Sequence, residues 1–268
     1  VANCKVETDS GSLSYDYLVI AIGARWNWHK VSGSENAFSL SSYEQACKAK
    51  KAITSFSGGT ICSIAAEGNR WEGPALETIF HAHAFLVERG MREGTALHYF
   101  TAKKRPFEEL GAQVSELLEK ELKKRKITLH TGTKVSKITS KEIEFLDGSK
   151  VASDISFLYP GYSGNQTLTG CGVTDFENFV LVDEHMRTME VKNVFAAGDC
   201  VNSLSLKLGF NALSGATVAG ENVAREILGK PLKKFVPKIV YVMELGVGEG
   251  LLINARLKAG KWEALTSR

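Results

Sequence analysis

The sequence has 268 residues, 44% of them hydrophobic, and its formal net charge of +3 comes from 33 basic and 30 acidic side chains. This balance gives no reason to expect a nucleic-acid partner, and the length suits one large or two ordinary domains. No run reaches the roughly 18 apolar residues of a membrane span, so none is expected. The five cysteines form no CxxC pair, which predicts neither a zinc centre nor a disulfide framework and favours a reducing, cytoplasmic location.

Residues 4–22 are expected to form a hairpin of a polar alternating strand, a turn at 9–12 and then the apolar segment "YDYLVIAIGA" (15–24) as the second strand. A continuous apolar run belongs to a sheet covered on both faces, so this strand is expected to be fully buried up to Gly23. Beyond it, helical spacing of apolar residues alternates with short apolar runs. Helices are expected over 41–56, 75–90, 109–126 and 211–228, and strands over 59–66, 95–102, 179–182 and 193–197.

Two stretches alternate between polar and apolar residues. Residues 127–160 are expected to form a meander of short strands with a tight turn at 147–148, and residues 239–265 a glycine-interrupted hairpin or meander. Elsewhere strands and helices follow one another in turn. The sequence therefore predicts an α/β protein with mainly parallel sheets.

The strand in "KNVFAAGDC" (192–200) stops abruptly at Gly198 and Asp199. Open α/β sheets bind ligands at the carboxyl ends of their strands, where a carboxylate can accept hydrogen bonds from ribityl or ribose hydroxyls. A glycine there lets the backbone approach phosphates closely. A plain turn is the alternative interpretation, but the second strand that ends in a glycine, at Gly23, favours a nucleotide site.

These two strands and several linking motifs carry a family resemblance. "YDYLVIAIGA" and "NVFAAGDC" resemble the second and third flavin-adenine-dinucleotide (FAD) signatures of the two-dinucleotide-domain flavoproteins. "NRWEGPALE", "LYPGYSGNQTL", "LKLGFNALSGATVAGENVA" and "IVYVMELGVGEG" are similar to the sulfide:quinone oxidoreductase branch, its archaeal members especially. The resemblance covers most of the chain and implies FAD as the cofactor.

The resemblance also implies which residues hold the cofactor. The strand tips would bind its adenine dinucleotide, ribityl and pyrophosphate parts, and two turns would lie near the isoalloxazine. Lys207 would act as the catalytic residue, because a fixed cation stabilises negative charge on the reduced ring. The strand-tip residues are Gly23, Gly198 and Asp199, and the turn residues are Pro160, Gly161, Lys207, Leu208 and Gly209.

The implied architecture has two Rossmann-like dinucleotide-binding domains. An FAD domain (1–41 and 160–228) would be split by an inserted second domain (42–159) and followed by a C-terminal strand segment (229–268). The family's GxGxxG phosphate loop has no counterpart after Val1, so we expect an N-terminally truncated chain that holds FAD weakly by itself. The family's C-terminal helices, which dock on the membrane and form the quinone site, also have no counterpart.

Sulfide oxidation in the family needs cysteine thiolates beside the flavin, because sulfur is relayed as a persulfide or disulfide. The matching positions here are Trp71, Tyr241 and Ser41, none of which is a redox thiol. The present cysteines are expected to be structural. The fingerprint for NADH is also missing, since the glycines of "SGGTICSIAAEG" precede the strand instead of following it. His81 and His83 stand two apart on a helix, which predicts no metal site.

Three hypotheses follow. The first is an FAD-dependent oxidoreductase of the sulfide:quinone oxidoreductase type whose donor is open; the second is an NADH dehydrogenase or NADH oxidase; the third is a non-catalytic flavoprotein-like subunit. The expected partner is a quinone or another electron acceptor. Peripheral attachment of the full-length protein to the inner face of the membrane and a homo-oligomer are left open.

Overall fold

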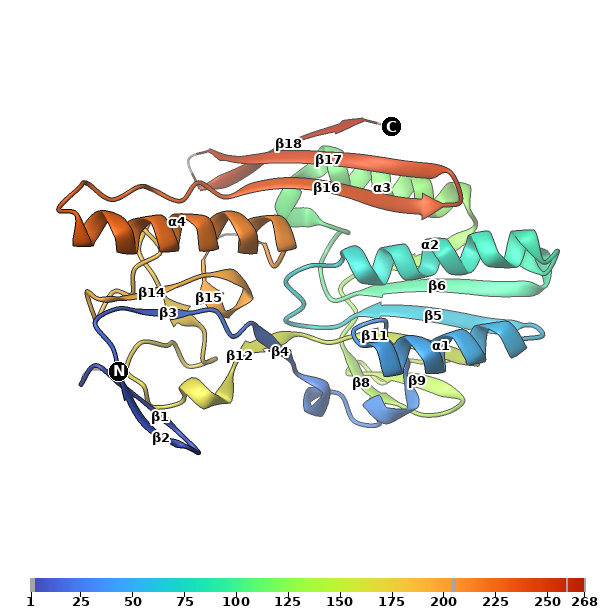
Figure 1. The fold of residues 1–268 in the computed structure, drawn as a ribbon. Coiled ribbons are helices and arrows are strands. Elements are labelled where there is room, and N and C mark those ends of the chain that lie inside the picture. Colours follow the sequence, from blue (N-terminus) through green and yellow to red (C-terminus); the bar gives the residue numbers. More distant parts are fainter. Residues whose placement is uncertain (1–2, 204–205, 259, 268) are drawn as a thin grey trace. The chain divides into compact units, whose positions relative to one another are not determined.

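The structure is a computed structural model that describes residues 3–203, 206–258 and 260–267 (Figure 1). The chain forms two compact units. Unit 1 comprises Val1–Arg25 and Tyr162–Ile239, and unit 2 comprises Trp26–Gly161 and Val240–Arg268. No helix of the described ranges is long and apolar enough to span a membrane. The helices are α1 (Tyr43–Ser55), α2 (Gly73–Glu88), α3 (Ala112–Lys124) and α4 (Gly209–Ile227).

Unit 1 is built from short strands and one long helix. A hairpin is present, but its strands are β1 (Lys5–Thr8) and β2 (Gly11–Ser14), and the apolar segment expected as its second strand lies outside it. Two parallel pairs follow, β3 (Leu18–Ile20) with β14 (Val194–Ala196), and β13 (Val180–Leu181) with β15 (Val201–Asn202). α4 packs on β14 and closes the core around Phe195 and Ala219. The strands β4 (Ala24–Trp26) and β12 (Tyr162–Gly164) lie where the chain passes between the units.

The expectation of a fully buried strand over 15–24 is wrong. The strand that forms, β3, has only three residues, and of these only Ile20 is buried. Val19 is 43% exposed and Ile22, just beyond the strand, is 46% exposed. The reason is the alternation of the strand: Leu18 and Ile20 pack on the core of unit 1, whereas Val19 points to the opposite face.

Unit 2 contains a four-stranded parallel sheet in the order β11–β5–β6–β7. α2 packs against β5, β6 and β11, and α3 packs against β7. On the other face, an antiparallel sheet in the order β10–β9–β8 shares a core with the parallel sheet around Ile64, Phe100 and Ile143. The parallel strands are β5 (Gly59–Ala65), β6 (Thr95–Thr101), β7 (Ile127–His130) and β11 (Ile155–Tyr159), and the antiparallel ones are β8 (Val135–Ile138), β9 (Glu142–Phe145) and β10 (Lys150–Ala152).

The expected meander over 127–160 is therefore only partly correct. β8, β9 and β10 form it, with the tight turn at Gly148 in a left-handed conformation. The two ends of the stretch, β7 and β11, instead join the parallel sheet on opposite edges. The alternation of polar and apolar residues in β7 had suggested a strand of the meander, but an edge strand of a parallel sheet can be partly exposed as well.

The remaining elements of unit 2 agree with the sequence. Ser42 caps α1 by accepting a hydrogen bond from the N–H of Gln45 at 3.2 Å. The C-terminal segment is a three-stranded antiparallel meander of β16 (Lys238–Gly246), β17 (Glu249–Lys258) and β18 (Lys261–Ser267). Figure 1 shows this meander, in red, beyond α2 and α3, on the side away from the parallel sheet. Both helices are therefore enclosed between two sheets. The α/β fold with a parallel core is confirmed; the domain boundaries stay a prediction.

Candidate functional site

The two strand tips singled out in the sequence meet in unit 1. β3 and β14 run parallel with Leu18 opposite Val194 and Ile20 opposite Ala196. The carboxyl ends of both strands thus lie at the same edge, so Gly23 and Gly198 follow neighbouring strands. The expectation that these tips come together is confirmed.

Backbone conformation explains the glycine at each tip. Gly23 has a φ of +68° and Gly198 a φ of +81°, a region that residues with a side chain rarely adopt. Among the residues that the structure describes, no atom lies within 4 Å of the place where a Cβ of Gly23 would stand, and at Gly198 the nearest is Ala212 Cβ at 3.6 Å. Glycine is therefore required by the left-handed backbone conformation at these two positions and not by crowding around a Cβ atom. The main chain at this edge is left open to close approach by a ligand.

Asp199 follows directly in a short turn over Gly198–Cys200. Burial raises the pKa of its carboxyl group, and the nearby ammonium of Lys207 acts in the opposite direction. Its carboxylate accepts no hydrogen bond from the residues that the structure describes. A half-buried carboxylate in this state is suited to accept hydrogen bonds from ligand hydroxyls.

Lys207 is anchored behind the same turn. Its Nζ donates hydrogen bonds to the carbonyl oxygens of Asp199 at 2.8 Å and Val201 at 2.7 Å, and lies 4.4 Å from the centroid of the Phe179 ring. The side chain is only 8% exposed. The structure therefore gives Lys207 a place as a fixed cation inside the turn, and its catalytic role stays a prediction.

The turn that follows Lys207 opens α4. Leu208 is the N-cap residue, and its side chain makes no capping hydrogen bond. α4 starts at Gly209, which is exposed, and no atom of the described residues lies within 4 Å of the place where its Cβ would stand. N–H groups in the first turn of a helix have no partners within the helix and carry its positive dipole end. The start of α4 therefore offers donors to a negatively charged group.

Pro160 and Gly161 belong to unit 2, so a common site with the strand tips stays a prediction. Gly161 is a glycine because of crowding: a Cβ there would lie 2.8 Å from the carbonyl oxygen of Glu67 and 2.9 Å from the carbonyl carbon of Gly68. Its own carbonyl accepts the N–H of Asn27 at 2.8 Å. Within unit 2, Gly161 thus lies where its own segment meets the backbone of residues 67–68 and of Asn27.

Two of the positions that the resemblance aligns with redox cysteines are in contact. The rings of Trp71 and Tyr241 lie 4.7 Å apart between centroids and meet edge to face at 76°. The ring of Phe107 also contacts Trp71, with 4.7 Å between the ring centroids and an interplanar angle of 81°. The side-chain oxygen of Asn69 accepts the N–H of Trp71 at 2.8 Å. An aromatic cluster thus fills the place where thiols would be expected.

Sequence reasoning missed Glu72, a fully buried carboxylate at the start of α2. It accepts hydrogen bonds from the hydroxyl of Tyr99 at 3.1 Å, the hydroxyl of Thr101, and the N–H of Phe107 at 2.7 Å. Lys103 Nζ lies 3.3 Å from it. Glu72 comes directly before the Gly-Pro pair that begins α2, and this position was the feature of the sequence that could have identified it.

The cysteines are all free, and the buried ones do not resemble redox thiols. Burial raises the pKa of Cys62 to about 12 and also raises the pKa of Cys200. The thiol of Cys200 lies 3.1 Å from the carbonyl oxygen of Ala197 and 3.4 Å from that of Ile20. A redox thiol needs a lowered pKa and access to solvent. The expectation that Cys62 is a core residue is confirmed.

One protein family matches most of the chain. A model of the pyridine nucleotide-disulphide oxidoreductase family matches residues 1–221. The mitochondrial sulfide:quinone oxidoreductase of Dictyostelium discoideum is 26% identical over 245 residues, covering 86% of this chain and 54% of that protein. The chain thus spans about half the length of this relative.

Solved structures are similar in fold. The sulfide:quinone oxidoreductase of Aquifex aeolicus superposes with a TM-score of 0.86 at 21% identity, covering 99% of this chain and 68% of that one. The water-forming NADH oxidase of Lactobacillus brevis, bound to NADH, has a TM-score of 0.64 at 17% identity and covers 91% of this chain and 53% of that one.

Proposed function

The chain belongs to the pyridine nucleotide-disulphide oxidoreductase family, and from that premise we propose that it is an FAD-dependent oxidoreductase of the sulfide:quinone oxidoreductase type. Two electrons would pass through the flavin to a quinone or another acceptor. The observation that carries this proposal is the parallel register of β3 and β14, which puts Gly23 and Gly198 at one edge of a sheet.

The residues at that edge fit the cofactor. The open backbone at Gly23 and Gly198 suits close approach of the dinucleotide, and the carboxylate of Asp199 would accept hydrogen bonds from ribityl hydroxyls. The uncapped N–H groups at the start of α4 would face a negatively charged part of it. Bound FAD would supply the two-electron chemistry, and Lys207 would contribute a fixed positive charge behind the turn.

We propose that the donor reduces the flavin without a protein thiol relay. Trp71 and Tyr241 fill the positions of the relay cysteines with aromatic rings, and Cys62 and Cys200 are buried with raised pKa values. NADH is disfavoured on a separate ground. A dinucleotide's pyrophosphate usually binds at the first helix N-terminus of its domain, and here the buried carboxylate of Glu72 stands at the start of α2.

Stopped-flow absorbance of the purified flavin-loaded protein tests this proposal. Mixing with sulfide should bleach the flavin band, and mixing with NADH at the same concentration should bleach it much more slowly. Rapid bleaching by NADH alone would instead support the NADH-oxidising alternative. Protein that carries no flavin when purified at full length would support a non-catalytic subunit.

The acceptor is tested in the same instrument. We propose a quinone, with peripheral membrane attachment of the full-length protein, because sulfide:quinone oxidoreductases are among its relatives. Flavin reduced by dithionite should regain its absorbance on mixing with decylubiquinone in the absence of oxygen. Reoxidation by oxygen alone, with none by the quinone, would contradict a quinone acceptor.

A further inference from the structure

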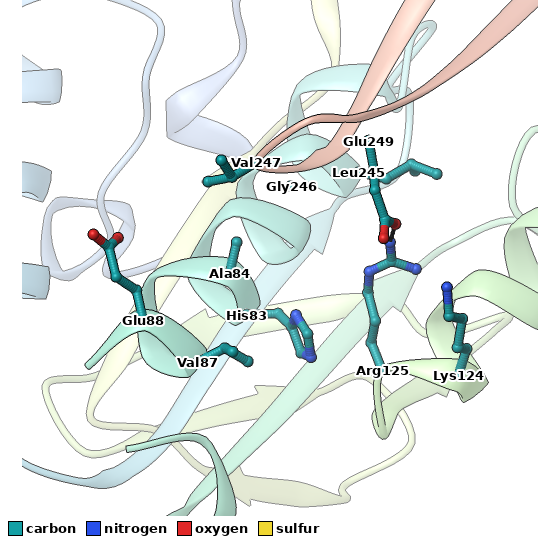
Figure 2. A pocket seen from close by; sticks show the side chains of 10 residues that line it. All are labelled: His83, Ala84, Val87, Glu88, Lys124, Arg125, Leu245, Gly246, Val247 and Glu249. Atoms are coloured by element: carbon teal, nitrogen blue, oxygen red, sulfur yellow. Dashed lines mark hydrogen bonds and ion pairs between the residues drawn. The ribbon is translucent and has the colours of Figure 1, made fainter. Parts of the chain in front are cut away.

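We propose that a cavity of unit 2 between α2, the end of α3 and the β16–β17 hairpin binds a small phosphate-bearing molecule, separately from the flavin edge. Two adjoining hollows of about 560 and 390 Å³ form this cavity, and they share His83, Val87, Lys124 and Arg125. Their sizes are those of small-molecule sites, which typically measure about 300 to 1,000 Å³. Figure 2 shows the larger hollow, with the ring of His83 and the guanidinium of Arg125 facing the same space.

The hairpin that forms one rim is held against the helix by a close approach. A Cβ at Gly246, whose φ is +129°, would lie 3.2 Å from Ala84 Cβ, so only glycine lets the hairpin turn lie directly on α2. Val87 and Leu245 add apolar surface to the lining. The cavity thus combines an apolar lining with polar groups on one side, a usual composition for a ligand site.

The cationic side of the cavity contains two different kinds of basic residue. Arg125 is 7% exposed and neutralised, because its guanidinium contacts Glu121 at 2.5 Å and also Glu249. These contacts hold the Arg125 side chain in one position at the edge of the cavity. Lys126 is likewise paired, with Glu93 at 3.1 Å. The three carboxylates therefore exceed these two cations by one negative charge.

Arg92 and Lys124 line the cavity and form no ion pair with the described carboxylates, although the charge of Glu93 also acts on Arg92. The guanidinium of Arg92 donates to the carbonyl oxygens of Thr95, Arg125 and Lys126 at 2.6 to 2.8 Å, so it is fixed in place by groups without charge. Its Nε is buried and has no hydrogen-bond partner. Lys124 is exposed and makes no ion pair with the described residues. At this end of the cavity four cations thus face three carboxylates, Glu93, Glu121 and Glu249, and the remaining positive charge favours an anionic ligand.

His83 lies between the apolar and cationic parts. Burial, followed by the charges of Arg92 and Arg125, lowers its pKa to about 4, and Glu249 acts in the opposite direction. The other charged groups that line the cavity are Glu88, Glu93, Lys124 and Lys126. At neutral pH the imidazole is neutral, and it makes no hydrogen bond with the described residues. An anion bound beside it would favour its protonated form, so His83 reports directly on occupancy.

Nuclear magnetic resonance of the histidine rings, titrated with inorganic pyrophosphate, tests the site. The six histidines give few signals, and His83→Gln identifies the one of interest. Pyrophosphate should shift the His83 signal selectively and raise its pKa toward the ordinary range. His81, on the same helix but outside this cavity, should respond only to ionic strength.

Matched lysine variants separate this site from general ionic effects. Lys124→Gln should weaken pyrophosphate binding about two- to fivefold, the usual effect of one exposed charge pair. Lys120→Gln, which removes an exposed lysine of α3 outside the cavity, should leave affinity unchanged. The proposal is overturned if the His83 signal does not move at millimolar pyrophosphate, if His81 moves equally, or if both lysine variants bind alike. None of these results depends on flavin content or turnover.

Discussion

The backbone N–H of Ala197 donates a hydrogen bond of 3.0 Å to the carbonyl oxygen of Ile20, which extends the pairing of β14 and β3 to the edge where both strands end. Residues far apart in the sequence are thereby fixed next to each other. The thiol of Cys200 lies against the same carbonyl oxygen at 3.4 Å. Strand pairing therefore positions Gly198 and Asp199 before any ligand binds.

Replacement of Gly198 by alanine should destabilise this edge. Gly198→Ala forces a side chain into a left-handed conformation, which costs about 1 to 2 kcal/mol. Urea unfolding should show that loss. Gly220→Ala is the matched control, because Gly220 is exposed within α4 and its Cβ would meet no atom, so the variant should be stabilised by up to about 1 kcal/mol. Equal effects of the two variants would contradict the assigned backbone conformation.

The pH dependence of stability should reveal the burial of Asp199. Its pKa in the folded protein lies above its ordinary value, so the folded state holds this proton more tightly than the unfolded state. The stability associated with this group is then greatest at low pH and is lost as pH rises through the folded pKa. Asp199→Asn has no carboxyl group to ionise, so its stability does not fall in this way as the pH rises.

We therefore expect the unfolding free energy of Asp199→Asn to exceed that of the wild type at pH 7 and to match it near about pH 3. Urea unfolding of the flavin-free proteins at both pH values measures this difference. A difference that is independent of pH, or a variant less stable at pH 7, would show that burial does not dominate the environment of this carboxyl group.

The aromatic cluster that replaces the redox cysteines should contribute strongly to stability. Trp71 is 4% exposed and contacts Phe107 and Tyr241. Trp71→Ala should lower the unfolding free energy by about 3 to 5 kcal/mol, the usual cost of truncating a buried aromatic residue. Trp71→Phe keeps a ring and should lose clearly less. Urea unfolding distinguishes them, and a near-neutral alanine variant would mean that the cluster is not packed as described.

Alkylation of the native protein should separate the cysteines into two groups. Cys62 and Cys200 are fully buried and have raised pKa values, so they should resist iodoacetamide at pH 8. Cys4, Cys47 and Cys171 are half-exposed and should react. Mass spectrometry of the digested protein locates the labels, and all five should be modified in denaturing urea. Rapid native labelling of Cys200 would indicate a reactive thiol beside the strand tips.

Local patterns in the sequence were enough to predict the tips of β3 and β14, the four helices and the C-terminal meander. Each depends on residues close in sequence, such as the glycine that ends an apolar run. The partners of β7 and β11 could not be predicted in the same way. Alternating polar residues suggest a half-exposed strand but do not distinguish a hairpin from the edge of a parallel sheet.

Parts of the site were also beyond sequence reasoning. The contact of Trp71 with Tyr241 joins distant segments, and nothing in the loop sequence around Glu72 shows that this carboxylate is buried. Its partners, Tyr99 and Thr101, come from a neighbouring strand that only the folded sheet brings near. Lys207 was expected near the flavin, but its anchoring to two carbonyl oxygens depends on the turn after β14.

Flavin content after substitution of Asp199 tests the central claim most directly. The flavin-to-protein absorbance ratio of purified Asp199→Ala should fall severalfold below that of the wild type, because the carboxylate at the strand tips no longer accepts hydrogen bonds from the cofactor. Asp16→Ala makes the same charge change in an exposed residue before the amino end of β3 and should keep full flavin content. Unchanged flavin in Asp199→Ala, or an equal loss in both variants, would contradict binding at this edge.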